Sequence, residues 1–383
     1  MPIRAEQQSW IIMEKKDYRR MNKTRIIYHI IKILVIIFIF LLSIDLLSTG
    51  FTRLGKDTAR DIISLTSNPF VSLFIGLLIT AIIQSSSTST SMIVALTASG
   101  SIGLKNAIPM IMGANVGTTL TSTIVSLAFI TRKKEFRKAL AAGSSHDFFN
   151  ILITCILFPL EYYYGFLSWI THQITDLVAP ALASDSSNGL QYEFPLTSGI
   201  TYYLMNLIDH PLVIIILAIT LLFGTIKILS QQIYKLLHGE FSDKLREHLK
   251  KPFTSFAWGT MLTAAVQSSS ITTSLIVPVV ATGKISLHKA FPFIMGANIG
   301  TTITALLAAL FKSEAAMSIA IAHLLFNLIG VLIFLPYYRL RNAPILLARE
   351  LGKLTMKYRL IGFIYIILMF FLIPFLLIYF NKI

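Results

Sequence analysis

Long apolar runs, separated by short polar segments, divide the chain and predict an all-α polytopic membrane protein. Seven of the runs have about the 17–25 residues that an α-helix needs to cross a bilayer. These predicted full spans are residues 26–47, 107–130, 139–160, 212–228, 290–311, 315–336 and 360–380. Two further apolar runs, residues 69–104 and 252–283, are each interrupted in the middle by polar side chains.

The interruption has the same sequence in both runs. It is Gln84-Ser85-Ser86-Ser87 in the first run and Gln267-Ser268-Ser269-Ser270 in the second. Polar side chains at membrane depth are costly unless something pairs with them. A polar cluster that occurs twice in this setting therefore predicts a duplicated site.

The duplication extends well beyond these four residues. More than half of the positions from 69 to 121 are identical to those found 183 residues later. The match includes Gly-Ala-Asn-x-Gly-Thr-Thr, at 113–119 and 296–302, and it resumes with His-x-x-Phe-Asn at 146–150 and 323–327. Chance similarity between apolar helices does not place polar residues in register over this distance, so the chain is predicted to hold two copies of one unit.

The distribution of charge decides how the two copies are oriented. Lys and Arg gather in residues 15–25, 132–138, 231–251 and 339–359, whereas residues 161–210 contain neither. Basic loops are retained in the cytoplasm. All four basic segments lie in the cytoplasm only if residues 69–104 and 252–283 are re-entrant helical hairpins, which return to the side of the membrane from which they entered. Three full spans then separate the hairpins, which gives an inverted-topology repeat with a cytoplasmic N-terminus, as in many secondary transporters.

This topology predicts five parts. They are a cytoplasmic lead-in (1–25), a first transport repeat (26–160), a mainly extracellular or periplasmic loop (161–208), a second, inverted transport repeat (209–343), and a cytoplasmic loop with a final transmembrane helix (344–383). The net charge of +15 does not indicate a nucleic-acid partner, because the basic residues lie in short loops between apolar segments. The predicted surroundings are a lipid bilayer.

The chemistry of the two interruptions suits an anion and a cation together. N-termini of half-helices present N–H groups to an oxyanion, while hydroxyl and carbonyl oxygens suit a hard cation such as sodium. No Lys or Arg occurs in either hairpin core. The candidate binding residues are Gln84, Ser85, Ser86, Ser87, Gln267, Ser268, Ser269 and Ser270, with Asn115, Thr118, Thr119, Asn298, Thr301 and Thr302 as the other wall. As an alternative, the Gly and Thr residues of that wall serve helix packing, with each Thr bonded to its own backbone.

Three other polar residues within predicted spans are candidates for a supporting or coupling role. Asp147 is an ionisable residue inside a span, which indicates function by default, although its place near the end of the span also allows a snorkelling or structural role. Asn150 and Asn327 occupy equivalent positions in the two copies. Nothing resembles a catalytic nucleophile with its base, a metal-ligand cluster or a cofactor motif, so an enzyme is not predicted.

These motifs resemble the type II sodium–phosphate cotransporter family, in particular its short bacterial members. The resemblance covers residues 26–340 and rests on the paired Gln-Ser-Ser-Ser motifs, the Gly-Ala-Asn-x-Gly-Thr-Thr segments and His146-Asp147-Phe148-Phe149-Asn150. It implies that the two Gln-Ser-Ser-Ser motifs bind phosphate and sodium at the repeat interface, with no individual sodium ligand assigned. It also implies a member without the PhoU-like C-terminal domain of many bacterial relatives.

The resemblance implies sodium-coupled import of inorganic phosphate across the bacterial inner membrane, with sodium as coupling ion. The motifs leave three alternatives open. The protein could export phosphate, carry another oxyanion such as arsenate or sulfate, or form an ion channel with paired re-entrant loops. The sequence predicts no particular oligomeric state.

Overall fold

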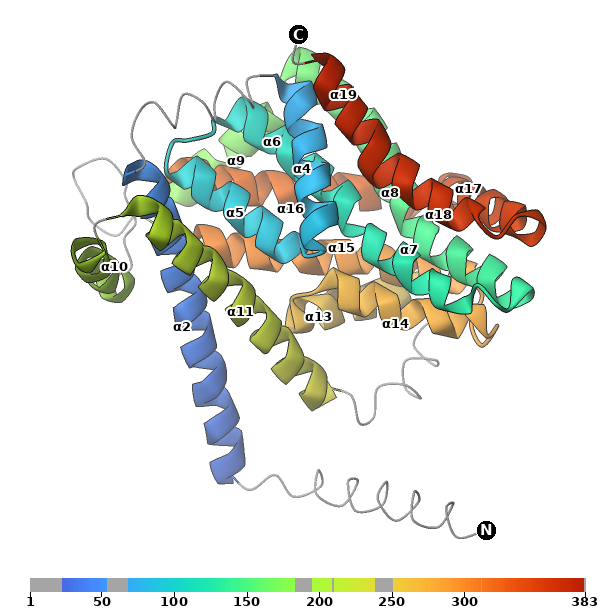
Figure 1. Cartoon of the computed structure of the whole chain (residues 1–383), viewed down its shortest axis with the longest axis horizontal. Coiled ribbons are helices and arrows are strands. Elements are labelled where there is room, and N and C mark those ends of the chain that lie inside the picture. The colour runs from blue at the N-terminus through green and yellow to red at the C-terminus, as the bar shows by residue number, and fades with distance from the viewer. Residues whose placement is uncertain are drawn as a thin grey trace.

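The structure, a computed structural model, describes residues 23–53, 68–182, 195–208, 210–237, 251–310 and 312–381. The regular elements of these residues are all helices (Figure 1). Seven of the described helical segments are long and apolar enough to cross a membrane. They are Ile31–Arg53, Leu104–Phe129, Lys133–Tyr164, Pro211–Ile228, Leu287–Ala309, Glu314–Phe334 and Ile361–Asn381. The prediction of an all-α polytopic membrane protein with seven spans is confirmed.

The two Gln-Ser-Ser-Ser runs each form a pair of shorter helices. The first pair is α4 (Pro69–Ile83) and α5 (Ser86–Ala98), and the second is α13 (Pro252–Val266) and α14 (Ser269–Ala281). With 15 and 13 residues, neither helix of a pair has the length of the full spans. The structure contains no membrane, so re-entry of these hairpins remains a prediction.

The helix after each hairpin packs closely along the hairpin's first helix. In the first copy α4 lies against α6 (Leu104–Thr118), and in the second α13 lies against α15 (Leu287–Ala309). A Cβ on Gly113 would lie 1.8 Å from the carbonyl oxygen of Leu73, and one on Gly296 would lie 2.1 Å from that of Phe256. Only glycine allows the backbones to approach this closely.

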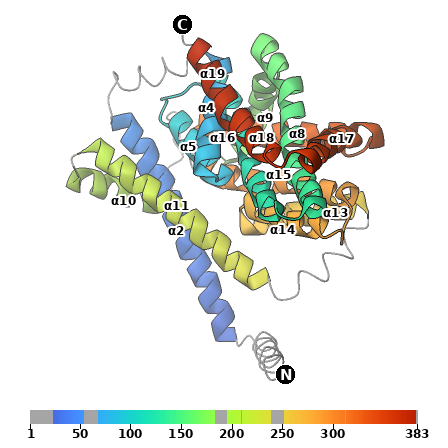
Figure 2. The same cartoon turned by 45° about the vertical axis from the view of Figure 1, so that its right-hand side comes forward.

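The two copies interlock through their last spans. Helix α8 (Lys133–Tyr164) of the first copy packs against α14 and α15, and α16 (Glu314–Phe334) of the second packs against α5 and α6. Figure 1 and Figure 2 show the hairpins on either side of α15. The buried rings of Phe149 and Phe291 meet edge to face, 5.7 Å apart. The core thus includes packing between the two copies as well as within each.

A separate group of helices extends from this core. Helices α2 (Lys23–Arg53) and α11 (Pro211–Leu237) lie side by side, and α10 (Pro195–Leu207) packs on α2 (Figure 2). An ion pair ties α2 to the second copy: Asp45 of α2 binds Lys312, which lies in the turn between α15 and α16. Thr201 of α10 donates a hydrogen bond of 2.8 Å to the other oxygen of Asp45.

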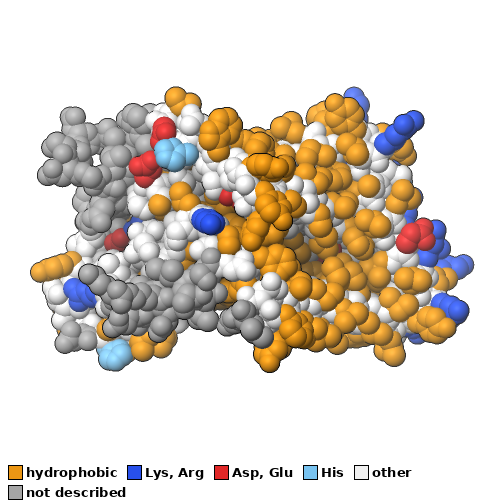
Figure 3. Space-filling model, turned by 90° about the horizontal axis from the view of Figure 1, so that it is seen from above, with side chains coloured by type: hydrophobic (Ala, Val, Ile, Leu, Met, Phe, Trp, Pro, Cys, Tyr) orange, Lys and Arg blue, Asp and Glu red, His pale blue; other side chains and the backbone are white. Residues whose placement is uncertain are grey.

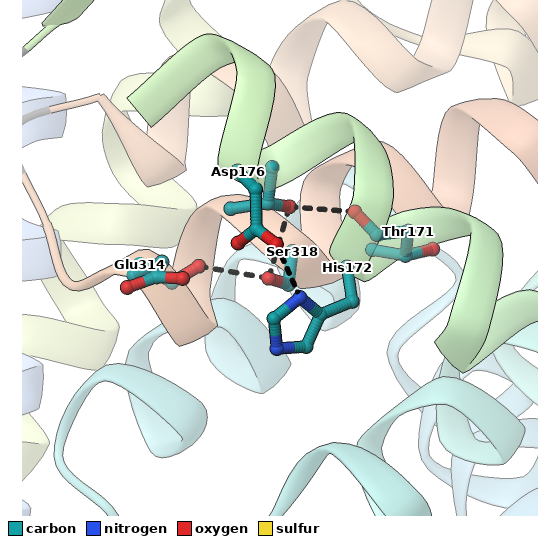
Figure 4. Close-up of polar contacts among 6 residues, drawn as sticks. Thr171, His172, Asp176, Glu314 and Ser318 are labelled. Carbon is teal, nitrogen blue, oxygen red and sulfur yellow. Dashed lines mark hydrogen bonds and ion pairs between the residues drawn. The ribbon is translucent and has the colours of Figure 1, made fainter. Parts of the chain in front are cut away.

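The segment predicted as an external loop, residues 161–208, contains helices. Besides α10, it forms α9 (Phe166–Leu182), whose amphipathic sequence packs one face on α16. Thr175 and Ser318 hydroxyls meet across this contact at 3.1 Å, and His172 pairs with Asp176 on the exposed side (Figure 4). The absence of Lys and Arg from this segment predicts on which side of the membrane it lies. It says nothing about secondary structure, so it does not exclude helices.

The segment predicted as a cytoplasmic loop before the last span is also helical. Helix α17 (Tyr338–Lys357) is amphipathic and buries Ile345, Ala348 and Gly352 against α8. Lys and Arg gather at the end of the molecule where α17 and the start of α8 lie, whereas hydrophobic side chains cover much of the middle of the face shown in Figure 3. The chain then forms α18 (Ile361–Ile367), the π-helical turn η2 (Leu368–Leu372) and α19 (Ile373–Asn381). The predicted lead-in, residues 1–25, lies almost entirely outside the described residues.

Candidate functional site

Both hairpins turn at the glutamine of the Gln-Ser-Ser-Ser motif. Gln84 has φ 55° and ψ 28°, and Gln267 has φ 53° and ψ 29°. They are the only non-glycine residues with positive φ in the described part of the chain. A left-handed backbone costs an L-residue about 1–2 kcal/mol. Because glycine would avoid this cost, the presence of glutamine at both turns indicates a role for its amide side chain.

The serine after each glutamine caps the helix that follows. Ser85 accepts a hydrogen bond from the backbone N–H of Thr88, and Ser268 accepts one from that of Ile271, both at 3.3 Å. The first N–H groups of α5 and α14 have no partner within their helices and point out of the helix N-termini. The motif therefore breaks the helix and presents backbone donors at the break.

The two hairpin tips meet. The Ser87 hydroxyl at the start of α5 donates to the backbone carbonyl of Gln267 at 2.7 Å and lies 3.4 Å from the hydroxyl of Thr304. This contact joins a hairpin of one copy to the turn of the other. The tips differ in exposure: Gln267 is 7% exposed, whereas Gln84 is exposed.

The asparagines of the two Gly-Ala-Asn segments bind the opposite copy. Asn298 accepts a hydrogen bond from His146 Nε2 on its Oδ1, at 2.5 Å, and donates from its Nδ2 to Asn150 Oδ1 at 2.6 Å. In the mirror arrangement, the Asn115 side-chain oxygen lies 3.2 Å from His323 Nε2 and also 3.2 Å from the side-chain nitrogen of Asn327. All of these side chains are buried. The His and Asn of each His-x-x-x-Asn motif thus hold the asparagine of the other copy.

The four threonines of the predicted wall bond to their own helices. Their hydroxyls donate to backbone carbonyls three or four residues earlier, over distances of 2.7–3.0 Å; they are Thr118, Thr119, Thr301 and Thr302. This geometry is the packing alternative considered from the sequence. Each hydroxyl oxygen keeps lone pairs that can accept a proton donor or bind a cation.

Asp147 lies in a buried polar pocket of the first copy. It is 0% exposed, so the snorkelling role considered from the sequence is wrong. Thr123 Oγ1 donates to Asp147 Oδ2 at 2.8 Å, and the Tyr365 hydroxyl donates to the same oxygen at 2.9 Å. Oδ1 has no hydrogen-bond partner among the described residues. The equivalent position of the second copy is Leu324, so this pocket exists in one copy only.

Several residues of this site were not predicted as such. His146 and His323 belong to the repeat, but nothing in the sequence indicates that each reaches the opposite copy. Thr123, Thr304 and Tyr365 are ordinary residues of apolar spans, and only the fold brings them to Asp147 or to a hairpin tip. The one feature of the sequence that could have indicated a role for the two histidines is the duplicated His-x-x-x-Asn spacing at 146–150 and 323–327.

Chemically, the site combines hydrogen-bond donors with oxygen ligands. Helix N-termini and serine hydroxyls can hold an oxyanion, and carbonyl, amide and hydroxyl oxygens can hold sodium. Among the described residues, no group of three or more His, Cys, Asp and Glu is placed to hold a metal ion. The oxygens that the two tips themselves offer to a cation are neutral: they belong to carbonyl, amide and hydroxyl groups.

Comparison with known proteins gives the family. The model of the Na+/Pi-cotransporter family matches residues 39–157 and 220–371, which is most of the chain. The chain belongs to the Na+/Pi-cotransporter family. The two matched regions include both hairpins, both Asn–His networks and the pocket of Asp147 and Tyr365.

Similar proteins are found among animal transporters. Sodium-dependent phosphate transport protein 2A of Ovis aries is 33% identical over 418 residues, which cover 88% of this chain and 65% of that protein. Protein 2A of Rattus norvegicus is 32% identical, over 88% of this chain and 65% of its own length. Protein 2B of Homo sapiens is 29% identical over 90% of this chain and 64% of its own length. This Na+/Pi-cotransporter chain thus spans somewhat less than two thirds of these relatives, and no solved structure matches it.

Proposed function

We propose that this protein carries inorganic phosphate across a membrane together with sodium ions, binding both where the two hairpin tips meet. Membership of the Na+/Pi-cotransporter family carries the proposal, since the family match includes both Gln-Ser-Ser-Ser motifs. The similar proteins 2A and 2B are named for sodium-dependent phosphate transport. The contact of Ser87 with the Gln267 carbonyl supports one shared site rather than two separate ones.

The binding residues in this proposal are those of the two motifs and the neighbouring asparagines. Phosphate is held by the N–H groups at the starts of α5 and α14 and by the serine hydroxyls. Sodium ions lie beside it on carbonyl, amide and hydroxyl oxygens, so that anion and cations neutralise one another in a region without Lys or Arg. The Asp147 carboxyl group supplies a fixed negative charge near one of the sodium positions.

Transport in this proposal follows alternating access between the two inverted copies. The different exposure of the two turns supports alternating access. Gln267 is buried and its carbonyl accepts a hydrogen bond from Ser87, whereas Gln84 is exposed. In the second state that we propose, the contact is reversed: Ser270, the equivalent of Ser87, donates to the Gln84 carbonyl, and the Gln267 turn becomes exposed. Two hairpins of the same sequence and opposite orientation give two such states of similar energy.

We propose the orientation from the distribution of charge. The basic start of α8 and the basic helix α17 lie in the cytoplasm in this proposal, and the N-terminus lies on the same side. In a bacterium this membrane is the inner membrane, where a sodium gradient directed inward drives import.

The decisive experiment is phosphate uptake into proteoliposomes with purified protein. An inward sodium gradient is expected to accelerate uptake of labelled phosphate over a matched potassium gradient. Arsenate and sulfate are added as competitors, and current is recorded at varied sodium. Uptake that ignores sodium would overturn the proposal, and currents without saturable phosphate flux would indicate a channel instead.

A further inference from the structure

The Asp147 carboxyl group is held on one side only. The hydroxyls of Thr123 and Tyr365 both donate to Oδ2, and Oδ1 has no hydrogen-bond partner among the described residues. Thr119 lies beside the same carboxyl group, although its own hydroxyl donates to the Val116 carbonyl. Leaving one oxygen of a buried carboxyl group unpaired is costly unless a cation or another donor reaches it.

The Tyr365 donor comes from outside the two repeats. Tyr365 lies in α18, in the last span, which follows the second copy and has no equivalent in either repeat. The last span packs on the first copy: Tyr365, Ile366 and Phe370 form one buried cluster with residues of α4, α6 and α7 (Leu120–Ser126). Figure 1 and Figure 2 both show α19 beside α4.

Two aromatic rings pack beside the buried ring of Tyr365 and restrict where its hydroxyl can lie. The centroid of the Tyr365 ring lies 6.1 Å from that of Phe148 and 6.3 Å from that of Phe370, and the side chain is 9% exposed. The π-helical turn Leu368–Leu372 begins three residues after Tyr365 and ends two residues before Pro374, which has no N–H to continue the regular pattern. π-turns are frequent at functional sites because they redirect a helix locally.

We propose that Tyr365 is a positioning residue for cation binding: its hydroxyl fixes the Asp147 carboxyl group through Oδ2, so that Oδ1 remains available to bind the coupling sodium ion. This inference rests on the proposed function. The last span thereby makes the two copies unequal, because the second copy has Leu324 in place of Asp147 and no equivalent of Tyr365. The last span also packs on α4 of the first hairpin. It therefore contacts both the Asp147 carboxyl group, through Tyr365, and the first hairpin.

The test compares Tyr365→Phe with the wild type in the proteoliposome assay. The substitution removes the hydroxyl and keeps the ring. We expect the half-saturating sodium concentration to rise about tenfold, as for the loss of one hydrogen bond to a charged group. The half-saturating phosphate concentration at saturating sodium is expected to change less than about twofold, on the same reasoning. The control is Tyr379→Phe, the same change at an exposed tyrosine of the last span that contacts Phe380.

A double-mutant comparison separates positioning from packing. If Tyr365 acts through Asp147, then adding Tyr365→Phe to Asp147→Asn has no further effect on sodium dependence. An unchanged sodium requirement in Tyr365→Phe, or an equal shift in both backgrounds, overturns the proposal. Sodium-independent uptake by the wild type would instead overturn the proposed function.

The folding of the variants provides a second measurement. If Tyr365→Phe is not recovered as folded protein but Asp147→Asn with Tyr365→Phe is, the hydroxyl is needed only because of the buried carboxyl group, which supports the proposal. Failure of both variants to fold would show that Tyr365 acts through packing and would overturn it.

Discussion

His146 Nε2 of the first copy lies 2.5 Å from the side-chain oxygen of Asn298 in the second copy. The mirror pair, His323 and Asn115, is joined at 3.2 Å. The two buried contacts cross between the copies, and each histidine is followed four residues later by an asparagine of the same network. The polar identities of the repeat thus hold the two halves together next to the hairpins.

Replacing His146 by Leu should destabilise the protein by about 1–3 kcal/mol, because the Asn298 amide loses a buried partner. Denaturant unfolding of the purified protein measures this loss. His172→Leu is the control, since the His172 side chain is 66% exposed and pairs only with Asp176 at the surface. Equal unfolding of the two variants would contradict a stabilising role for the crossed contacts.

Ser86→Ala and Ser269→Ala should each abolish phosphate uptake and leave folding intact. The Ser269 hydroxyl is buried and has no hydrogen-bond partner among the described residues, so its removal breaks no contact of the folded protein. Uptake together with the unfolding midpoint tests this. Ser99→Ala, at the far end of α5, serves as control because that hydroxyl bonds the local carbonyl of Leu96. Near-normal uptake by both variants would refute the site.

Gln267→Gly should separate the backbone role of this glutamine from that of its side chain. Glycine adopts the left-handed turn without strain, so we expect unchanged stability or a gain of up to about 1 kcal/mol. Transport should be lost with the amide. Gln267→Val keeps a side chain but is strained at this φ, and it should lower the unfolding midpoint. Full transport by Gln267→Gly would show that only the turn matters.

Gly113→Ala should prevent correct folding, because the added Cβ would lie 1.8 Å from the Leu73 carbonyl oxygen. The helices α4 and α6 would have to separate, and the first hairpin would lose its support. The yield of monodisperse protein in size-exclusion chromatography measures the effect. Gly199→Ala is the matched control, since a Cβ there meets nothing within 4 Å. Equal yields would argue against the close packing.

Asp45→Asn should destabilise the attachment of α2 to the second copy. The Asp45 and Lys312 side chains are only 12% and 11% exposed, and removing one partner of a buried pair costs about 3–5 kcal/mol. Adding Lys312→Met should recover part of this loss, because no buried charge is then left alone. The unfolding midpoints of the single and double variants test the pairing, and simple additivity would contradict it.

Much of the fold could be predicted from the sequence because a bilayer admits few solutions. A spanning segment must be apolar, about 20 residues long and helical, so hydropathy predicts the spans. The hairpin breaks were likewise visible, since Gln84 and Gln267 interrupt apolar runs at equivalent places. The helices α9, α10 and α17 were missed because charge bias reports the side of the membrane and not the secondary structure.

The site was predictable only in part, and the reason is physical. Duplication of polar residues in apolar surroundings identifies the tips, because each unpaired polar group there is costly. It does not identify partners, because these contacts join residues far apart in the chain: Ser87 with Gln267, His146 with Asn298, and Asp147 with Tyr365. The sequence alone determined the spans, the repeat and the family resemblance. The tertiary structure decided that the asparagines cross between the copies, that the threonines bond their own helices, and that the last span reaches the buried Asp147, since those contacts depend on how the helices pack.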